Sequence, residues 1–408
     1  MIKIKYISLL EYFLCFLVIL SCRTVYVHSI NYNISTIVSL MLMFIIIFLI
    51  FIRHDKKIKT KKIFFIVFLI CYIFFYLIMA VKTNVMSFVK NFLIILPLFM
   101  IYLSMLNRNE LGELLKKYSR IIIGLAVCSL FFYLFGSCMK VLKPNIVTIL
   151  EWGGNTKVNG YFFLHFDVQT TSFFGKSILR NTGIFVEGPM YSLQLILAYA
   201  FILFEDRKVI NKKSIILAIT LFTTLSTTGM IIFVILSFYK FLKFGEKKKK
   251  ILILPIALII CVFAVIILFN GKKNDTNSNS YSIRTDDIKV AIMSFKNNPI
   301  FGDGYMNNSV AISNMSDFRL YNTGLSSTFA VILIQGGIYF SIIYILPIIF
   351  LMVKSYREKD YEIFVIAIVE FLLYFTTIFQ YTNLMMFLIA FNINSILNIE
   401  DKLCDTKL

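Results

Sequence analysis

The chain has 408 residues, of which 59% are hydrophobic, 16% aromatic and only 15% charged. Soluble domains carry about 45–50% apolar and about 25% charged residues, so this composition excludes an ordinary cytosolic enzyme, a disordered chain and a secreted disulfide scaffold. The formal net charge of +19 would suggest nucleic acid binding in a soluble protein. In so apolar a chain, the first explanation for the positive charge is the excess of Lys and Arg on the cytoplasmic side of membrane proteins.

Apolar runs that are long enough to cross a bilayer as helices recur along the whole chain. They predict an all-α integral membrane protein with about twelve transmembrane helices. A basic stub, Met1–Lys5, leads into the first run without a small-residue cleavage site, which predicts a span and not a removed signal peptide. The spans are expected near residues 7–21, 33–52, 63–81, 91–106, 121–138, 188–204, 214–226, 229–243, 251–269, 326–350, 362–379 and 384–398.

The pair at 214–243 is ambiguous, because Ser226–Gly229 interrupts one continuous apolar run. A single tilted helix would put its two ends on opposite sides of the membrane. Both flanks are basic, so a hairpin of two short helices fits the charge pattern better.

With both termini in the cytoplasm, most of the 41 Lys and Arg residues fall in the segments placed inside. The positive charge therefore serves topology, and we expect no nucleic acid partner. This pattern is typical of a multi-pass membrane protein with both termini in the cytoplasm. The seven Cys and three His residues are scattered, so we expect no metal site and no disulfide framework.

Two predicted external loops, 139–187 and 270–325, are much longer than the other connections. Loops of more than about 12–15 residues are usually functional or disordered. The first loop is rich in aromatic residues and Gly, which favours a packed surface. The second contains Ile288, Ala291, Ile292 and Phe295 at the spacing of one helical face, which predicts an amphipathic helix near 283–296 on the outer membrane surface.

The external loops contain most of the residues that are candidates for chemistry. Arg180 and Glu187 stand just before a predicted span, where a guanidinium and a helix N-terminus bind an anion and a carboxylate orients a hydroxyl. The alternative is an ion pair that closes the loop onto the helix bundle. Three further external cations are candidates for substrate binding or for contact with lipid headgroups: Lys176, Arg284 and Arg319.

Several other polar residues have a structural interpretation beside the functional one. Asp286, Asp287 and Asp303 are candidate bases but are expected as solvated loop or helix-cap charges, and His165 is a candidate base or a loop-packing residue. Glu370 and Gln335 lie inside predicted spans, where polar residues are functional candidates. A hydrogen bond to Ser226–Thr228 or to another hydroxyl of the bundle is the alternative for both.

Four segments, in this order, resemble the Wzy-type polymerases of O-antigen and capsular polysaccharides. They are RNTGIFVEGPMYSLQL from Arg180, TTLSTTGMIIF from Thr223, NNPIFGDGY from Asn297 and YNTGLSSTFAVILIQGGIYF from Tyr321. The resemblance implies a GT-C-like polytopic glycosyltransferase bundle with no cofactor. It would join oligosaccharide repeat units carried on undecaprenyl diphosphate at the outer face of the bacterial plasma (inner) membrane. A chain-length regulator and a flippase are candidate partners.

The resemblance also implies roles for particular residues. Arg180 and Glu187 are the candidate catalytic residues, and Arg284, Lys176, Arg319 and Asn322 are the candidate substrate-binding residues. One feature departs from the family. Related ligases and many polymerases carry a His before the tenth span, where this chain has Tyr321–Ser327. The alternatives are an O-antigen ligase or another lipid-linked glycosyltransferase, and a polysaccharide flippase.

Overall fold

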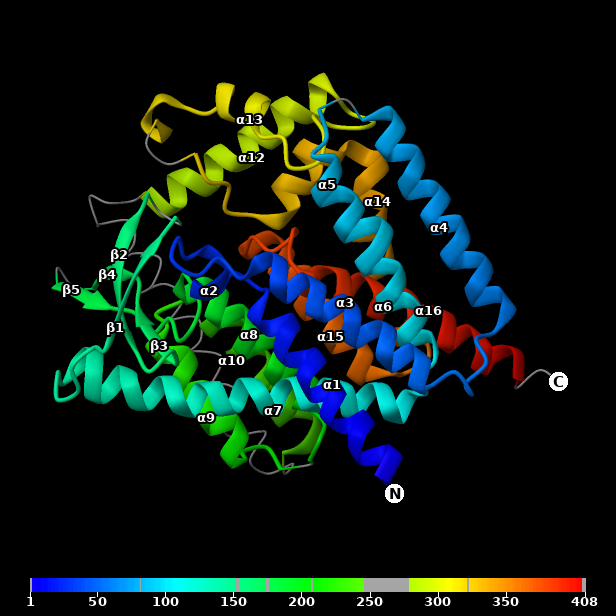
Figure 1. Ribbon diagram of the computed structural model, residues 1–408, viewed down its shortest axis with the longest axis horizontal. Coiled ribbons are helices and arrows are strands. Elements are labelled where there is room, and N and C mark those ends of the chain that lie inside the picture. The colour runs from blue at the N-terminus through cyan, green and yellow to red at the C-terminus, as the bar shows by residue number, and fades with distance from the viewer. Residues whose placement is uncertain are drawn as a thin grey trace. The chain divides into compact units, whose positions relative to one another are not determined.

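The computed structural model describes residues 2–80, 82–151, 154–173, 176–206, 208–245, 279–320 and 323–405. The described chain is mostly helical (Figure 1) and divides into two compact units, each of which is described by itself. The first unit consists of Met1–Cys22, Ile37–Glu113 and Asn279–Leu408, and the second of Arg23–Thr36 and Leu114–Ser278.

The first unit is built from helices of very different lengths. They are α1 (Ile2–Leu20), α3 (Ser35–Ile52), α4 (Thr60–Met79), α5 (Val85–Phe88), the π-helix η1 (Val89–Ile95), α6 (Leu96–Ser104), α12 (Asn279–Asn297), α13 (Ser309–Ser313), the 3₁₀ turn η3 (Asp317–Arg319), α14 (Thr328–Arg357), α15 (Tyr361–Thr376) and α16 (Asn383–Asp405). Helix α14 packs against α12, α15 and α16, and its contact with α15 is the most extensive between two helices of this unit.

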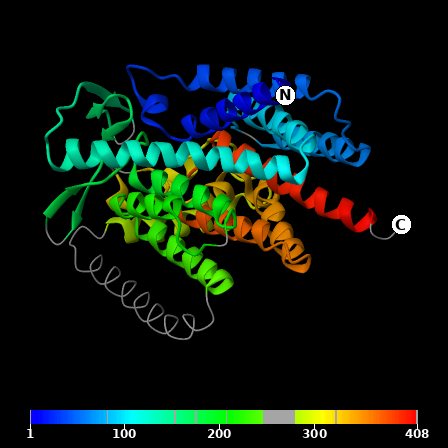
Figure 2. The ribbon, with the colours of Figure 1, turned by 90° about the horizontal axis from the view of Figure 1, so that it is seen from below.

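The second unit combines helices with short strands. Its helices are α2 (Val25–His28), α7 (Arg108–Phe132), which begins in the first unit, the π-helix η2 (Tyr133–Cys138), α8 (Gly188–Ile202), α9 (Lys212–Thr223) and α10 (Thr227–Phe244). Figure 2 shows α8, α9 and α10 side by side. The strands are β1 (Ile146–Leu150), β2 (Thr156–Tyr161), β3 (His165–Asp167), β4 (Thr170–Phe173) and β5 (Lys176–Leu179).

A helix occupies every predicted span that falls on described residues, while the predicted span 251–269 lies outside them. Among the described residues, six helical segments are long and apolar enough to cross a membrane, and α8 and residues Asn383–Ile399 form shorter apolar helices. The six are Ser35–Ile52, Thr60–Met79, Val85–Ser104, Arg108–Cys138, Thr227–Phe244 and Thr328–Arg357. The fold is therefore consistent with a polytopic membrane protein, and the total of twelve spans stays a prediction.

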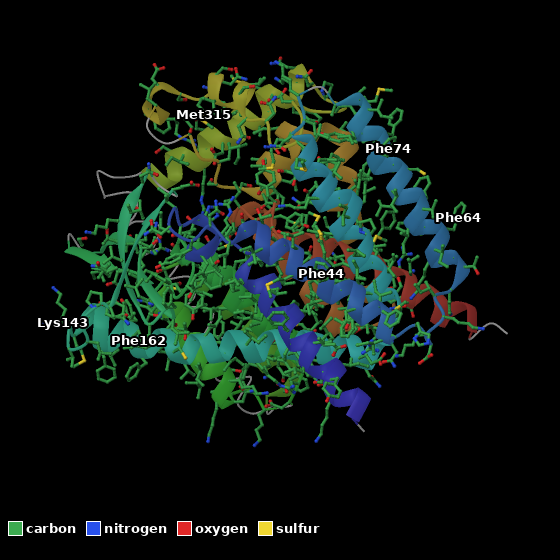
Figure 3. The ribbon with its side chains drawn as sticks, viewed as in Figure 1. Phe44, Phe64, Phe74, Lys143, Phe162 and Met315 are labelled. Atoms are coloured by element: carbon green, nitrogen blue, oxygen red, sulfur yellow. The ribbon has the colours of Figure 1, made fainter. Side chains whose placement is uncertain are left out.

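Helices α3 and α4 expose large aromatic side chains. Phe44 on α3 is 72% exposed, and Phe64 and Phe74 on α4 are 75% and 52% exposed and point away from the other helices (Figure 3). Water would disfavour such a surface, whereas lipid tails are as apolar as these side chains. The exposed face of α4 is therefore suited to contact with lipid.

The apolar run 214–243 is divided into two helices by a turn at Thr224–Ser226, whereas Thr227, Thr228 and Gly229 of the predicted interruption already belong to the second helix. Helix α9 ends at Thr223 and α10 begins at Thr227, and Leu225 between them has a φ of +51°. Helix α10 then packs closely on α8, because a Cβ atom at Gly229 would lie 1.8 Å from Ser192 Oγ.

The prediction of an all-α protein is wrong for the segment between α7 and α8. Strands β1, β2 and β3 form an antiparallel sheet in that order, in which Ile146 pairs with Gly160 and Tyr161 with His165, and β4 pairs with β5. Thr148 and Leu150 of β1 are buried while Val147 and Ile149 are exposed, the period of two that a strand requires. The aromatic and Gly-rich loop is thus packed, but packed as sheet.

Helix α14 is broken in its first half, at Gly337. Gly337 has a φ of +54° and a ψ of −153°, a conformation that is essentially confined to glycine. A break leaves backbone N–H and C=O groups without helical partners, and such groups at membrane depth are tolerated only where protein satisfies them. The break therefore needs a partner within the protein.

The loop of residues 298–304 is that partner. The N–H groups of Ile338 and Tyr339 donate to the carbonyls of Pro299 and Ile300 at 2.8 and 2.9 Å. In return, the N–H groups of Asp303 and Gly304 donate to Ile334 and Gln335 of α14 at 2.8 and 3.0 Å. The loop and the break thus satisfy each other's backbone groups.

Helix α4 holds the same break from another side. Tyr76 donates its hydroxyl to the Gln335 carbonyl at 2.6 Å, and the Tyr72 hydroxyl donates to the Tyr339 carbonyl at 2.6 Å. The rings of Tyr72 and Tyr339 stack with their centroids 4.1 Å apart. Since α4 and the 298–304 loop both depend on the shape of the break, the three segments form one structural assembly.

We predict that Gly337→Ala destabilises the protein strongly. The positive φ alone costs about 1–3 kcal/mol, and the new Cβ atom would lie 2.5 Å from the Ile300 carbonyl oxygen. The fraction of protein that stays monodisperse after heating in detergent measures the effect. Gly124→Ala on α7 is the control, because no atom lies within 4 Å of its new Cβ. Equal stability of the two variants would contradict this account of the break.

Candidate active site

Arg180 lies across the N-terminus of α8. Its guanidinium covers Gly188, since a Cβ atom there would lie 2.7 Å from both Nε and Nη2 of Arg180. Nε donates to the Thr224 carbonyl at 2.8 Å, and Nη1 donates to Gln169 Oε1 at 3.1 Å. Among the described residues, Nη2 makes no hydrogen bond, which leaves a donor for an anion at a helix end that itself favours negative charge.

The residues that follow Arg180 are fixed to the rest of the second unit. Asn181 is buried, and its side-chain nitrogen donates to Thr223 Oγ1 at 3.0 Å at the end of α9. Thr182 is also buried and donates to the Phe166 carbonyl of β3 at 2.7 Å. Gly183 has a φ of +54°. These three residues hold the segment in place, so that Arg180 has little freedom to move.

Glu187 precedes the first turn of α8 in an extended conformation and is half-buried. The chain just before Glu187 is fixed, because Val186 donates its N–H to the Arg23 carbonyl at 3.1 Å and Phe185 forms a β-bridge with Thr24. The carboxylate makes no capping hydrogen bond to α8. It is thus held at the helix start, near Arg180, without serving as the cap.

Burial lowers the pKa of Arg180 to about 10, and the nearby Glu187 carboxylate opposes that shift. At neutral pH the guanidinium therefore stays protonated. The structure brings a half-buried cation, a carboxylate and a helix N-terminus together in one place, which suits the binding of an anion next to a hydroxyl that must lose a proton.

Sequence reasoning missed Gln169 of this site. Its side-chain oxygen accepts from Arg180 Nη1 and from the Gly188 backbone N–H at 3.2 Å, and so ties the cation to the helix start. A Gln between two aromatic-rich segments carries no local signal. Only the pairing of the strands around it decides that it reaches Arg180.

Two of the predicted substrate-binding residues lie largely outside what the structure describes. Lys176 begins β5, but its side chain is not among the described ones, and Asn322 lies outside the described residues. Arg284 is half-buried on α12 of the first unit, where Nη2 lies 3.4 Å from the Thr376 carbonyl. Arg284 and Arg180 thus belong to different units.

Arg319 is buried with only 1% of its surface exposed. Its Nη1 donates to Asp287 Oδ1 at 2.9 Å and lies 3.5 Å from Asp286 Oδ2, while Nη2 donates to the Gly324 carbonyl at 2.7 Å. The positive charge is balanced within the protein by two carboxylates. Arg319 is therefore placed to hold the segment before α14 against α12.

The expectation that Asp286, Asp287 and Asp303 are solvated charges is wrong, because they are 5%, 0% and 5% exposed. Asp287 accepts from the N–H and hydroxyl of Ser326 at 2.8 and 2.5 Å, beside its pair with Arg319. Helix α12 accordingly turns its acidic side inward. Two residues of its predicted apolar face, Ile288 and Ile292, are 59% and 50% exposed, whereas Ala291 is buried.

His165 is fully buried, as the loop-packing interpretation predicts. Its Nε2 lies 3.0 Å from Ser137 Oγ and 3.4 Å from Asp167 Oδ1. Burial raises the pKa of Asp167, but hydrogen bonds from His165, Ser137 and Tyr161 outweigh it, and the pKa is lowered. A catalytic triad uses both ring nitrogens, whereas Ser137 and Asp167 share one here, so the cluster does not have that geometry.

Glu370 and Gln335 make structural hydrogen bonds within the first unit, though not to Ser226–Thr228. Glu370 accepts from Asn392 Nδ2 at 2.9 Å and from the Tyr374 hydroxyl at 3.1 Å. Gln335 accepts from the Met306 N–H at 3.0 Å. Both are satisfied by residues of their own unit. Among the described residues, no group of three or more His, Cys, Asp or Glu side chains is placed to hold a metal ion.

The fold and this site define a mostly helical membrane protein with the means to bind an anion at a helix N-terminus. A family model described as O-antigen ligase matches residues 214–345, which is less than half of the chain. The match includes Thr224, α12 and the break of α14. It supports an O-antigen ligase-like or polymerase-like membrane glycosyltransferase in polysaccharide biosynthesis and does not separate the two activities. No curated protein and no solved structure matches the chain.

We predict that Gly188→Ala reduces activity by about 10–100-fold without unfolding the protein. The new Cβ atom would displace the end of the Arg180 side chain and meets no backbone atom among its nearest contacts. Glycan length in cells and thermal stability in detergent check the two parts, with Gly124→Ala as the control. Full activity would contradict the proposed position of Arg180.

We predict that Arg319→Met destabilises the protein by about 3–5 kcal/mol, because it leaves buried carboxylates without a cation. Adding Asp286→Asn and Asp287→Asn should restore part of that stability, as measured by thermal unfolding in detergent. A stable Arg319→Met variant that has lost activity would instead assign Arg319 to the substrate.

Proposed function

We propose that the protein polymerises oligosaccharide repeat units that are carried on undecaprenyl diphosphate, at the outer face of the bacterial plasma membrane. The observation that supports this most directly is the Arg180 guanidinium on the N-terminus of α8 with Glu187 beside it. The proposal places both termini in the cytoplasm. A chain-length regulator and a flippase would be its partners in the membrane.

The proposed reaction needs a base and a stabilised leaving group. A hydroxyl oxygen of the next lipid-linked unit attacks C1 of the sugar that bears the diphosphate. The C1–O bond breaks with its electron pair, which leaves on undecaprenyl diphosphate, and the hydroxyl proton passes to the base. Fixed positive charge that meets the developing negative charge accelerates such a step by about 10²–10³-fold per group.

Arg180 is our candidate for stabilising the leaving diphosphate. A guanidinium binds phosphate oxygens in a bidentate manner, and the amide N–H groups at the start of α8 add to the attraction. Its hydrogen bonds to Thr224 and Gln169 hold the cation in place before the substrate arrives. In the first unit, we propose that Arg284 binds a phosphate of the same class of substrate.

Glu187 is our candidate for the base. It is half-buried at the start of α8 and is near enough to Arg180 to affect the pKa of that side chain. The His that related ligases carry before the tenth span is absent from Tyr321–Ser327, so another group must accept the proton. The same absence, together with the residues Gly324–Ser327, counts against an O-antigen ligase.

A broken helix such as α14 is also a feature of transporters, which place ions and substrates at such breaks. There, however, the unwound backbone must be available to the ligand. In this protein the 298–304 loop already occupies the backbone groups of the break. This arrangement favours a rigid glycosyltransferase over a flippase.

We predict that Arg180→Ala and Glu187→Gln each collapse long glycan chains to single repeat units that stay on the carrier lipid at the outer surface. Removal of a general base costs about 10²–10⁴-fold. The measurement is the size of lipid-linked glycan in cells that carry the remaining polysaccharide genes, compared with a deletion strain.

Lys157→Ala and Glu151→Gln are the matched controls, since both residues are exposed and lie in the same loop. They should leave the chain length unchanged. Long chains that accumulate on the carrier lipid in the deletion strain would indicate a ligase. Single units retained on the cytoplasmic face would indicate a flippase.

A further inference from the structure

A pocket of about 410 Å³ opens beside the 298–304 loop in the first unit. Its size falls in the range of about 300–1,000 Å³ that is usual for small-molecule sites. The walls come from the end of α4, the end of α12, the loop and α13. They are formed by Met79, Lys82, Asn297, Asn298, Pro299, Ile300, Phe301, Gly302, Asp303, Asn307 and Val310.

The pocket is preformed, because its floor is the loop that fills the break of α14. Asn84 donates its N–H to the Tyr305 carbonyl at 2.9 Å, and the Asn91 side chain donates to the Tyr305 hydroxyl at 2.8 Å. These bonds tie the connection after α4 to the residues that follow the loop. A preformed site loses less free energy to ordering when a ligand binds.

The polar groups of the pocket suit a neutral ligand that is rich in hydroxyls. Lys82 contributes one positive charge and Asp303 one negative charge, so the lining lacks the excess of cations that a diphosphate needs. Asp303 is itself held by the side chains of Asn298 and Ser294, with Asn298 Nδ2 at 2.7 Å. Amide groups such as that of Asn297 both donate and accept, as sugar hydroxyls do.

The apolar groups complement the other face of a sugar. Ile300 is 58% and Met79 45% exposed, and Phe301 is half-buried in the same wall. A pyranose ring presents C–H groups on its faces and hydroxyls at its edge, which matches an apolar wall beside amides. A polyprenyl tail would instead favour a wall without Lys82 and Asp303.

Helix α12 relates this pocket to Arg284. The pocket is at the last residue of α12, Asn297, and Arg284 is thirteen positions earlier on the same helix. At 1.5 Å per residue, the two ends are about 20 Å apart. A substrate whose diphosphate is near Arg284 would therefore reach the pocket only with sugars further along its glycan.

We propose that this pocket binds a neutral sugar residue of the lipid-linked oligosaccharide, several sugars away from the carrier diphosphate. The inference rests on the proposed function for the identity of the glycan. The pocket supplies binding and selection of the repeat unit and takes no part in bond breaking. Lys82 and Asn297 are the specificity-determining residues.

The test uses the repeat-unit oligosaccharide released from its carrier, without lipid or phosphate, as the probe. Its binding to the purified full-length protein in nanodiscs is measured by saturation-transfer NMR and calorimetry. We expect Lys82→Gln and Asn297→Ala to weaken binding at least 10-fold and to leave thermal stability unchanged. Lys143→Gln and Asn31→Ala, which change exposed residues elsewhere, are the matched controls, and Arg180→Ala should also bind normally.

Three outcomes would overturn the proposal. The first is that an active protein does not bind the free glycan. The second is that the two pocket variants bind the glycan as well as the wild type does. The third is that polyprenyl phosphate displaces the glycan from the pocket, which would make the lipid its occupant. Glycan binding that depends on Lys82 and Asn297 in a protein that makes no polymer would support the pocket and refute the proposed function. The two proposals can therefore fail separately.

Discussion

The exchange of backbone hydrogen bonds between α14 and the 298–304 loop is the interaction on which the first unit depends. An apolar helix that breaks at Gly337 must satisfy its backbone groups inside the protein, and Pro299, Ile300, Asp303 and Gly304 do so. Because the loop follows α12 directly, the position of α12 is coupled to the break. The segment before α14 is then held to α12 by Arg319. A single helix break thus organises α12, the 298–304 loop and α14, together with α4, which is distant in sequence and contacts the break through Tyr72 and Tyr76.

In the second unit, contacts with α9, β3 and the chain around Thr24 fix the segment before α8. The segment Asn181–Gly183 is tied to α9 by Asn181 and to β3 by Thr182, and the residues before α8 pair with the chain around Thr24. The residues that follow Arg180 therefore serve mainly to hold this segment in place. They thereby fix the Arg180 side chain on the N-terminus of α8, which is the position of Arg180 that the proposed chemistry requires. Rigid support of a charged group is what makes electrostatic stabilisation effective.

Arg180 and Arg319 differ in the carboxylates that surround them. Arg319 has two buried partners, Asp286 and Asp287, so its charge is used within the fold. Arg180 is near one half-buried carboxylate and hydrogen-bonds to a carbonyl and an amide oxygen, neither of which neutralises it. The charge of Arg180 is therefore balanced by fewer carboxylates than the charge of Arg319. For this reason we propose a structural role for Arg319 and a role at the substrate for Arg180.

The sequence by itself determined where the helices lie, because hydrophobic length and the distribution of Lys and Arg depend on single residues and their neighbours. It also pointed to Arg180, Glu187 and the segments around them. It did not reveal the strands of the 139–187 loop, the burial of Asp286, Asp287 and Asp303, or the contact of Gln169 with Arg180. Those depend on pairing between residues that are distant in sequence. Only the tertiary structure decided them, since whether a charge is solvated or balanced is set by the residues packed against it.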